Sequence, residues 1–230
     1  MKRFYKSAGT QEREDGYEVQ LDGLTIRTPL KAALMAPTEA LAREIAREWD
    51  QQTETVRPEA MPLTRLANTA LDRVVPRKDP VIDEIAAFGQ SDLLCYRATA
   101  PMELVERQAQ AWTPLLRWAE DCHGASLHVT EGIMPVDQPA DAVTALSAAV
   151  AALDPFRLAG LHTLTTITGS LVLGLAVVDG KLAAQEAHVL SVIDETFQAE
   201  QWGLDEEAEQ RLGNRKTEIR AAGQFLELLS

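Results

Sequence analysis

The residues from 158 to 178 contain no charged side chain, and this run constrains the fold more than any other feature. A run of this length could cross a bilayer, because a membrane-spanning helix needs about 20 predominantly apolar residues. However, it includes His162, Ser170 and several threonines and glycines, and its continuous apolar part, 171–178, is far too short to span. We therefore predict two buried helices that meet near residues 168–170, and no membrane insertion.

The two ends of the chain have different residue patterns. In residues 1–40, alternating apolar and polar positions flank Asp22-Gly23, which predicts a hairpin in a small antiparallel sheet. From residue 139 onward almost every segment has helical periodicity. We predict an α+β fold that is predominantly α, with an N-terminal α/β part over 1–85 and a C-terminal helical part over 86–230.

Two helices outside the apolar run are also predicted. Thr38 is a suitable N-cap for the segment that follows it, in which Leu41, Ile45 and Trp49 recur every four residues. This stripe predicts that Trp49 packs in the core and has a structural role. A second helix begins near residue 102, and we expect Pro114 to kink or break it.

Composition excludes several classes of function. The net charge of −13 disfavours binding to nucleic acid and to anionic membranes. Cys95 and Cys122 do not make a disulfide framework. Cys122, His123 and His128 lack the close pairing of a zinc site, and there is no phosphate-binding glycine loop, so we expect no metal and no cofactor.

The segment "DETFQAEQWG", residues 194–203, is the most informative for function. A helix through it has an apolar stripe formed by Leu190, Ile193 and Phe197. It has a second face formed by Ser191, Glu195, Gln198 and Trp202. Adjacent helical residues point about 100° apart, so Asp194 and Glu195 make a poor acid/base pair. A helix with one buried face and one polar face with a tryptophan suits contact with a partner.

Two alternatives to partner contact stay open from spacing alone. Trp202 could pack into its own domain while Glu195 is merely solvated. Alternatively, the chain could be a small-molecule enzyme with an acidic pocket in which Glu195 acts as a base. No recognisable nucleophile, nucleotide loop or metal cluster in the sequence supports the enzyme.

Several long segments resemble one known family. They are "LDGLTIRTPLKAALMAPTEALAREIAREWDQQ", "MPLTRLANTALDRV", "DLLCYRA", "QAQAW" before "TPLLRW", and "DETFQAEQWG". In this order they resemble the Atp-twelve family, which assists assembly of the F-type ATP synthase. The resemblance extends from about Tyr5 to about Leu229.

The resemblance implies a function, a fold and a site. Family members bind the free alpha subunit of the synthase head and leave as the alpha/beta hexamer forms; they are not enzymes and carry no cofactor. Their helical part is an orthogonal bundle. The hallmark matched by Asp194, Glu195, Gln198 and Trp202 is expected to contact the partner, with Phe197 and Gly203 structural. The segment matched by Glu48, Trp49 and Gln52 is expected to be mainly structural.

The resemblance also suggests where the protein works. The family occurs in alphaproteobacteria and in mitochondria. The chain starts close to the family's own start, so we expect a bacterial cytoplasmic protein, or a mitochondrial matrix protein if this is a processed form. We expect it to be a monomer when free.

Overall fold

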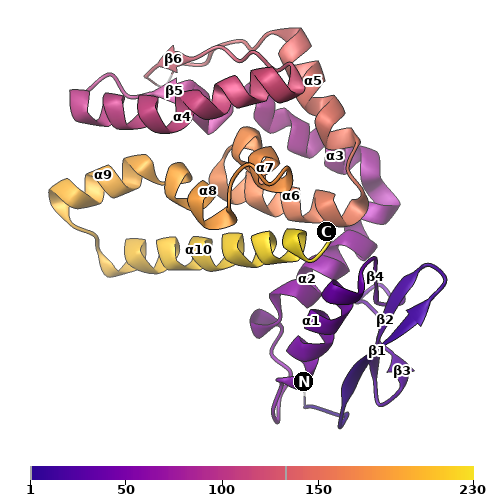
Figure 1. Cartoon of the computed structure of the whole chain (residues 1–230). Helices are drawn as coiled ribbons and strands as arrows, with labels where there is room; N and C mark the ends of the chain where they lie inside the picture. The colour runs from indigo at the N-terminus through magenta and orange to yellow at the C-terminus, as the bar shows by residue number, and fades with distance from the viewer. Residues whose placement is uncertain (1, 133) are drawn as a thin grey trace. The chain divides into compact units, whose positions relative to one another are not determined.

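The computed structural model describes residues 2–132 and 134–230, and these form two compact units (Figure 1). The first unit comprises the chain from its N-terminus to Lys78, together with Asp154–Gly160 and Ala221–Ser230. The second comprises Asp79–Leu153 and Leu161–Arg220. The fold is mostly helical with a small antiparallel sheet near the N-terminus, which confirms the predicted fold class. The division into domains at residues 85 and 86 stays a prediction.

The sheet of the first unit has four short strands. They are β1 (Ala8–Arg13), β2 (Gly16–Leu21), β3 (Leu24–Thr25) and β4 (Met35–Ala36). Strand β2 pairs antiparallel with each of the others. Asp22 and Gly23 both have positive φ, as the two-residue turn of a tight hairpin requires, so the predicted hairpin is confirmed. The longer β1–β2 hairpin was not predicted, because β1 is polar and largely exposed.

Helix α1 (Glu39–Asp50) packs against β1 and β2. The Leu41 amide donates to Thr38 Oγ1 at 3.2 Å, which confirms the predicted cap. Leu41 and Ile45 are fully buried and Trp49 is half-buried. After η1 (Pro58–Ala60), the chain continues as α2 (Pro62–Thr69), the π-helical turn η2 (Ala70–Val74) and η3 (Val75–Arg77).

The remaining elements are mainly helices. They are α3 (Lys78–Ala86), η4 (Ala87–Gln90), η5 (Leu93–Cys95), β5 (Tyr96–Arg97), α4 (Met102–His123), β6 (Thr130–Glu131), α5 (Ala140–Ala151), α6 (Pro155–Thr168), α7 (Leu171–Val178), α8 (Ala184–Ser191), α9 (Ile193–Trp202) and α10 (Glu206–Glu227). The short strands β5 and β6 pair in parallel. Among the described residues, none of the helices combines the length and the apolarity needed to cross a bilayer.

The uncharged run forms two helices, as predicted. Helix α6 ends at Thr168, and α7 begins at Leu171 after Gly169, which has a φ of 71°. The buried carboxylate of Asp92 links the start of α7 to the segment around η5. It accepts hydrogen bonds from the Val172 amide at 2.9 Å and from the Leu94 amide at 3.0 Å. Burial raises the pKa of Asp92, and these N–H donors oppose the rise.

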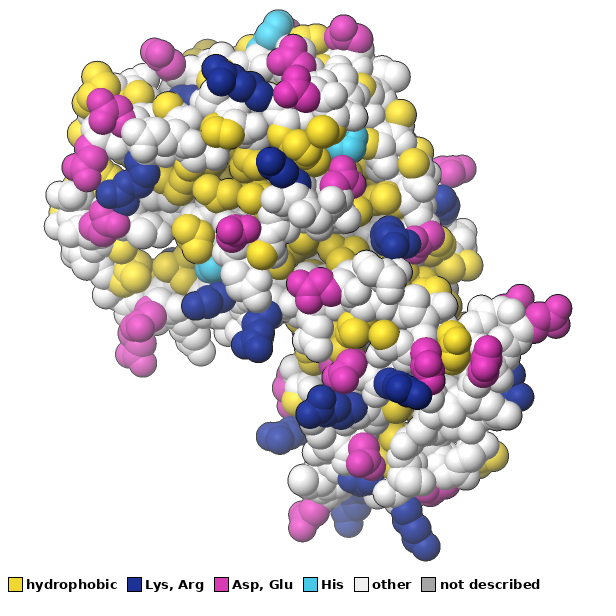
Figure 2. Space-filling view, viewed as in Figure 1, with side chains coloured by type: hydrophobic (Ala, Val, Ile, Leu, Met, Phe, Trp, Pro, Cys, Tyr) yellow, Lys and Arg dark blue, Asp and Glu magenta, His cyan; other side chains and the backbone are white. Residues whose placement is uncertain are grey.

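Helix α4 continues through Pro114, so of the kink or break expected there, the break does not occur. An interior proline costs about 3 kcal/mol through its missing N–H and its steric clash. The buried side chains of Trp112, Leu115 and Leu116 offset this cost, since they lie in the core of the second unit. Figure 2 shows apolar side chains gathered in the layer between α4 and helices α7 to α9.

Candidate partner-binding site

Helices α8 and α9 replace the single helix that the spacing predicts. The chain leaves helical geometry at Val192, with φ −117° and ψ 24°, and α9 begins at the next residue. Helix α9 ends at Gly203, where φ is 79° and the amide donates to Ala199 O at 2.8 Å. A positive φ suits glycine, which has no Cβ, so Gly203 ends the helix as expected.

Helix α9 has one buried and one exposed face. Ile193 and Phe197 belong to the core of the second unit, and Phe197 is 4% exposed. Glu195, Gln198 and Trp202 are exposed, with Trp202 79% exposed. These positions follow i, i+3 and i+7 spacing, which places them along one side of a helix.

Ser191 does not belong to this exposed face, so that part of the expectation is wrong. The break at Val192 puts Ser191 at the end of α8, where it is 4% exposed. Its hydroxyl donates to His188 O at 2.8 Å. The interruption has no glycine or proline to announce it, so the periodic pattern continues across it in the sequence.

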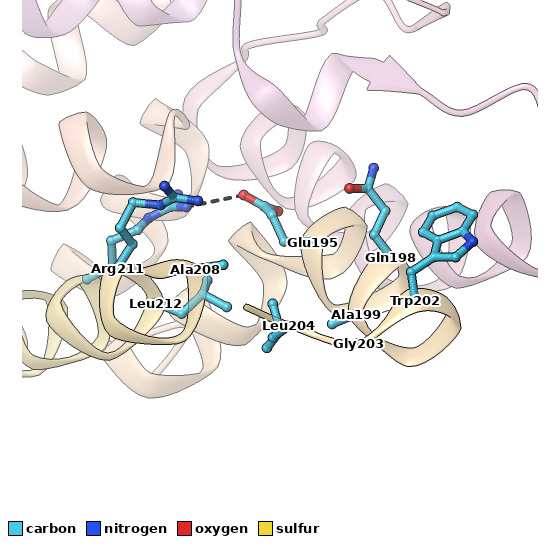
Figure 3. A pocket seen from close by; sticks show the side chains of 10 residues that line it. Glu195, Gln198, Ala199, Trp202, Gly203, Leu204, Ala208, Arg211 and Leu212 are labelled. Carbon is cyan, nitrogen blue, oxygen red and sulfur yellow. Dashed lines mark hydrogen bonds and ion pairs between the residues drawn. The ribbon is translucent and has the colours of Figure 1, made fainter. Parts of the chain in front are cut away.

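The exposed face of α9 borders a cavity of about 410 Å³ (Figure 3). We call this the α9–α10 cavity. Its lining residues come from these two helices and the turn between them: Glu195, Gln198, Ala199, Trp202, Gly203, Leu204, Ala208, Arg211, Leu212 and Arg215. In Figure 3, the Glu195 carboxylate reaches toward an arginine of α10, while Trp202 lies at the opposite end of the site. The cavity thus has a charged end and an aromatic end.

The charged end is an ion pair with a second anchor. Arg215 Nη1 donates to Glu195 Oε1 at 3.2 Å, and Arg215 Nη2 donates to the carbonyl oxygen of Ile167 at 2.9 Å. Arg211 pairs instead with Glu207, at 2.9 Å. Exposed ion pairs of this kind contribute about 0–1 kcal/mol, so a partner can displace either at little cost.

Asp194 points to a different environment from its neighbour. It is half-buried, and its Oδ1 accepts Gln108 Nε2 of α4 at 2.6 Å. Burial raises the pKa of Asp194, the hydrogen bond from Gln108 lowers it, and the charge of Glu195 raises it. The two adjacent carboxylates therefore have different partners, and the arrangement is not that of an acid/base pair.

Arg107 provides a further link between α4 and α9. Its guanidinium donates to both carboxylate oxygens of Glu200, at 2.9 and 3.0 Å, and lies 5.3 Å from the centre of the Phe197 ring. This bidentate pair and the cation–π contact hold α9 against α4. Gln108, Arg107 and Arg215 were not predicted, because nothing local in the sequence identifies a partner so far along the chain.

The Glu48 segment is bound into the first unit. Glu48 is 9% exposed and caps the start of α2, because Oε1 accepts the Leu63 amide at 2.8 Å and Oε2 accepts the Thr64 amide at 2.8 Å and its hydroxyl at 2.7 Å. Burial raises the pKa of Glu48, and the hydrogen bonds from Thr64 and Leu63 oppose the rise. Gln52 is also buried, and its Nε2 donates to Glu48 O at 3.0 Å.

Trp49, the next residue along α1, is partly exposed. Its indole meets the Tyr5 ring edge-to-face at 5.8 Å between centroids, and the Tyr5 hydroxyl donates to Trp49 O at 2.6 Å. Trp49 therefore joins α1 to the N-terminal segment.

A metal site and a reactive cysteine are two further possibilities for chemistry in this chain. Among residues 2–132 and 134–230, no three His, Cys, Asp or Glu side chains lie close enough to hold a metal ion. His123 instead contacts Asp179, with Nε2 3.0 Å from Oδ2. Cys95 is buried, and burial raises the pKa of its thiol to about 12, which makes it a poor nucleophile near neutral pH.

A family model, a relative with a known name and solved structures all relate this chain to the same family. Residues 2–120 match the family model described as ATP12 chaperone protein. The chain is 26% identical over 219 residues to "Protein atp12, mitochondrial" of Schizosaccharomyces pombe, which covers 90% of this chain and 75% of that protein.

Among the solved structures, two from Paracoccus denitrificans match along the whole chain. The crystal structure of Atp12 from Paracoccus denitrificans has 48% sequence identity and a TM-score of 0.95, covering 100% of this chain and 98% of that one. A point mutant of P. denitrificans Atp12p has 47% identity, a TM-score of 0.96 and the same coverage.

Proposed function

This chain belongs to the ATP12 chaperone family, and we propose that it assists assembly of the F-type ATP synthase by binding the unassembled alpha subunit of the catalytic head. In this proposal it prevents aggregation of the alpha subunit and releases it when the alpha/beta hexamer forms. We further propose that it acts in a bacterial cytoplasm, or in the mitochondrial matrix. The S. pombe relative is named as a mitochondrial protein.

One observation carries the binding part of this proposal: Trp202, a large aromatic side chain, is 79% exposed at the rim of the α9–α10 cavity. Tryptophan dominates interface energetics when it is buried by a partner, and it keeps one N–H donor for a polar contact. An unassembled subunit exposes apolar surface that is meant for its neighbour, and such surface is prone to aggregation. The cavity and Trp202 suit a surface of that kind.

The charged end of the cavity supplies the polar part of the proposed contact. Glu195 and Gln198 would meet a cationic or N–H group of the alpha subunit, with that group competing against Arg215 for the carboxylate. Asp194 belongs to the proposed surface through its exposed half, while its bond to Gln108 holds the start of α9 on α4. Release needs only a competitor that binds the alpha subunit more tightly, and the beta subunit would fill that role without ATP hydrolysis.

The enzyme alternative has less support. Its proposed base, Glu195, is exposed and paired with Arg215, and the family to which the chain belongs is named as a chaperone family. A general base needs a substrate proton within hydrogen-bond reach, and the Glu195 carboxylate already accepts a hydrogen bond from Arg215.

Light scattering of the isolated alpha subunit tests the proposal. Wild-type protein at equimolar concentration should suppress the scattering equally with and without ATP. Trp202→Ala should lose most of the suppression while it melts like wild type, because the side chain is exposed. Val189→Ala removes apolar surface from the neighbouring helix α8, where Val189 is 63% exposed, and should behave like wild type. A strict ATP requirement, or full activity of Trp202→Ala, would contradict the proposal.

A further inference from the structure

Strand β1 forms an open edge of the sheet in the first unit, and the proposed function does not use it. It pairs on one side only, with β2. The other side of β2 is occupied by β3 and β4, which are only two residues long. Within residues 2–132 and 134–230, β1 is therefore the one long strand whose outer edge has no strand beside it.

The backbone groups that point outward belong to alternate residues of β1. Val19, which lies opposite Thr10, donates its amide to Leu34 O at 3.0 Å, on the side away from β1. Thr10 and Val19 are therefore a non-hydrogen-bonded pair, and the N–H and C=O groups of Thr10 point outward. Ala8 and Glu12 share this orientation, because it repeats at every second residue.

The middle of this edge lacks the features with which proteins usually block strand pairing. Ala8–Gln11 contains no charge and no proline, and β1 pairs with β2 residue for residue, without a bulge. An exposed edge of this kind is a template for another strand. The ligand that it selects is an extended polypeptide, because such a backbone presents acceptors and donors with the same repeat.

A hollow of about 450 Å³ lies between β1 and α1. Ala8, Gly9 and Thr10 line it from the strand, and Ala46 and Gln51 are among the residues that line it from the helix side. An added strand would direct every second side chain toward α1, on the same face as the half-buried side chains of Ala8 and Thr10. The hollow has room for these side chains.

The charged residues that line the hollow already have partners. Arg43 pairs with Glu39, Arg47 pairs with Glu44, and Asp50 pairs with Arg3. A charged side chain that entered the hollow would have to compete with one of these pairs, so it would gain little. The hollow therefore favours uncharged side chains, and β-branched ones also suit the geometry of a strand.

A second copy of this chain fits the edge less well than a segment of another protein. Pairing of two β1 strands would bring only the small side chains of Ala8 and Thr10 to the face beside α1. Most of the hollow would then stay empty, and its lining would lose the contacts that larger side chains provide.

We propose that β1 takes up an extended segment of another protein as an additional antiparallel strand, with uncharged β-branched side chains of that segment in the hollow beside α1. Antiparallel pairing is the more stable arrangement per residue. Ala8 and Thr10 each exchange two N–H···O=C bonds with a residue of the segment. The inference goes beyond the proposed function, because it requires neither the alpha subunit nor the α9–α10 cavity.

The backbone amide signals of β1 give a direct readout. The probe is the blocked peptide acetyl-Lys-Gly-Val-Thr-Val-Gly-Lys-amide, titrated into the whole protein, and its end lysines keep it soluble. In ¹H–¹⁵N spectra the Ala8 and Thr10 signals should move downfield and saturate near about 1 mM, a modest affinity for a short peptide. The Gly9 and Gln11 signals should move little, because these amides face β2. Strand addition predicts this alternation, whereas non-specific adhesion does not.

Matched peptides separate backbone pairing from side-chain contact. The probe with N-methyl groups on both valines loses the donors that face β1, and should bind at least about tenfold more weakly, or about 1.4 kcal/mol. The probe with an N-methyl group on its threonine, whose N–H faces away from β1, should keep its affinity within about twofold.

Matched variants test the same bonds from the side of the protein. Thr10→Pro removes an outward N–H but no bond to β2, and proline is tolerated at such edge positions, so this variant should fold and lose the probe. Thr10→Val keeps the N–H and should bind like wild type. The remaining spectrum of each variant verifies its fold.

Three results would overturn the proposal. The β1 amide signals could stay fixed at probe concentrations well above about 1 mM. The probe with glutamate or lysine in place of both valines could bind as well as the original, which would show that the hollow does not select side chains. The protein alone could form a dimer in analytical ultracentrifugation that Thr10→Pro abolishes, which would assign the edge to a second copy. None of these results bears on the alpha-subunit assay.

Discussion

Two segments of this protein contain the same three residue types in opposite environments. Glu48, with Trp49 after it on α1 and Gln52 just beyond the end of that helix, is buried against α2. Glu195, with Gln198 and Trp202 after it on α9, is exposed along the α9–α10 cavity. Composition and helical spacing are therefore not enough to separate a structural segment from a contact surface.

The neighbours of each glutamate decide the difference. Glu48 accepts hydrogen bonds from the Leu63 and Thr64 amides, which are unpaired donors at the start of α2, and a third from the Thr64 hydroxyl. Glu195 receives one cation, Arg215, that is itself partly exposed. A carboxylate with several protein donors can be buried, whereas a carboxylate with one exposed partner stays available to another molecule.

The largest expected effect is that of Trp49→Arg. The substitution removes the ring contact with Tyr5 and puts a cation where an indole was half-buried. We expect a loss of about 3 kcal/mol in the free energy of unfolding. For a chain of this size the melting temperature should fall by roughly 6–12 °C.

Trp202→Arg is the control, because it makes the same change at an exposed position. It should stay within about 0.5 kcal/mol of wild type in a melting experiment. If Trp49→Arg melts like wild type but no longer binds the alpha subunit, the two tryptophans have the same role and the comparison fails.

A smaller loss of stability is expected for Glu48→Gln. The glutamine has one acceptor oxygen in place of two, so its amide group must face one of the N–H donors of Leu63 or Thr64. An unsatisfied buried donor costs about 1–3 kcal/mol, which urea unfolding of the purified variant should detect.

Glu195→Gln, the same change on α9, should unfold within about 0.5 kcal/mol of wild type, because only an exposed ion pair is lost. Equal losses in the free energy of unfolding for the two variants would show that Glu195 stabilises the fold as much as Glu48 does.

A small effect on stability, with a large effect on binding, is expected for Glu195→Lys. The new cation faces Arg215 on the protein and any cationic group of the alpha subunit. We expect affinity for the alpha subunit to fall about a hundredfold, or a few kcal/mol. A binding isotherm and a melting curve on the same preparation measure both quantities.

Glu209→Lys changes the charge equally at an exposed glutamate near the start of α10. It controls for a general effect of net charge and should bind normally. Normal binding by Glu195→Lys, or its unfolding, would remove Glu195 from the proposed contact surface.

Periodicity predicted the parts of the fold that depend on neighbours in sequence. It indicated the buried position of Phe197, and Gly203 marked the helix end. Spacing left open whether Trp202 packs into its own domain, and only the structure places it on the surface. Periodicity failed for Ser191, because the change of helix at Val192 has no local marker.

Interactions between distant residues could not be predicted in the same way. In the sequence, nothing distinguishes Asp92 from other polar residues, and the secondary structure of its segment is ambiguous. In the structure Asp92 is fully buried and caps α7. Pro114 reads as a helix breaker, but packing of the surrounding side chains maintains α4. In each case the deciding partner lies far along the chain, where a single sequence does not show it.

The ion pair between Glu195 and Arg215 has a consequence for the selectivity of the α9–α10 cavity. A client that brings its own cation exchanges one pair for another, so the net gain in electrostatic energy is a difference between two similar quantities. Screening by salt weakens both pairs together. Charge alone then selects weakly, and a cationic surface without an apolar patch for Trp202 gains little by docking there. If the cavity binds a partner as proposed, Arg215 would therefore reduce the affinity for proteins that offer positive charge alone.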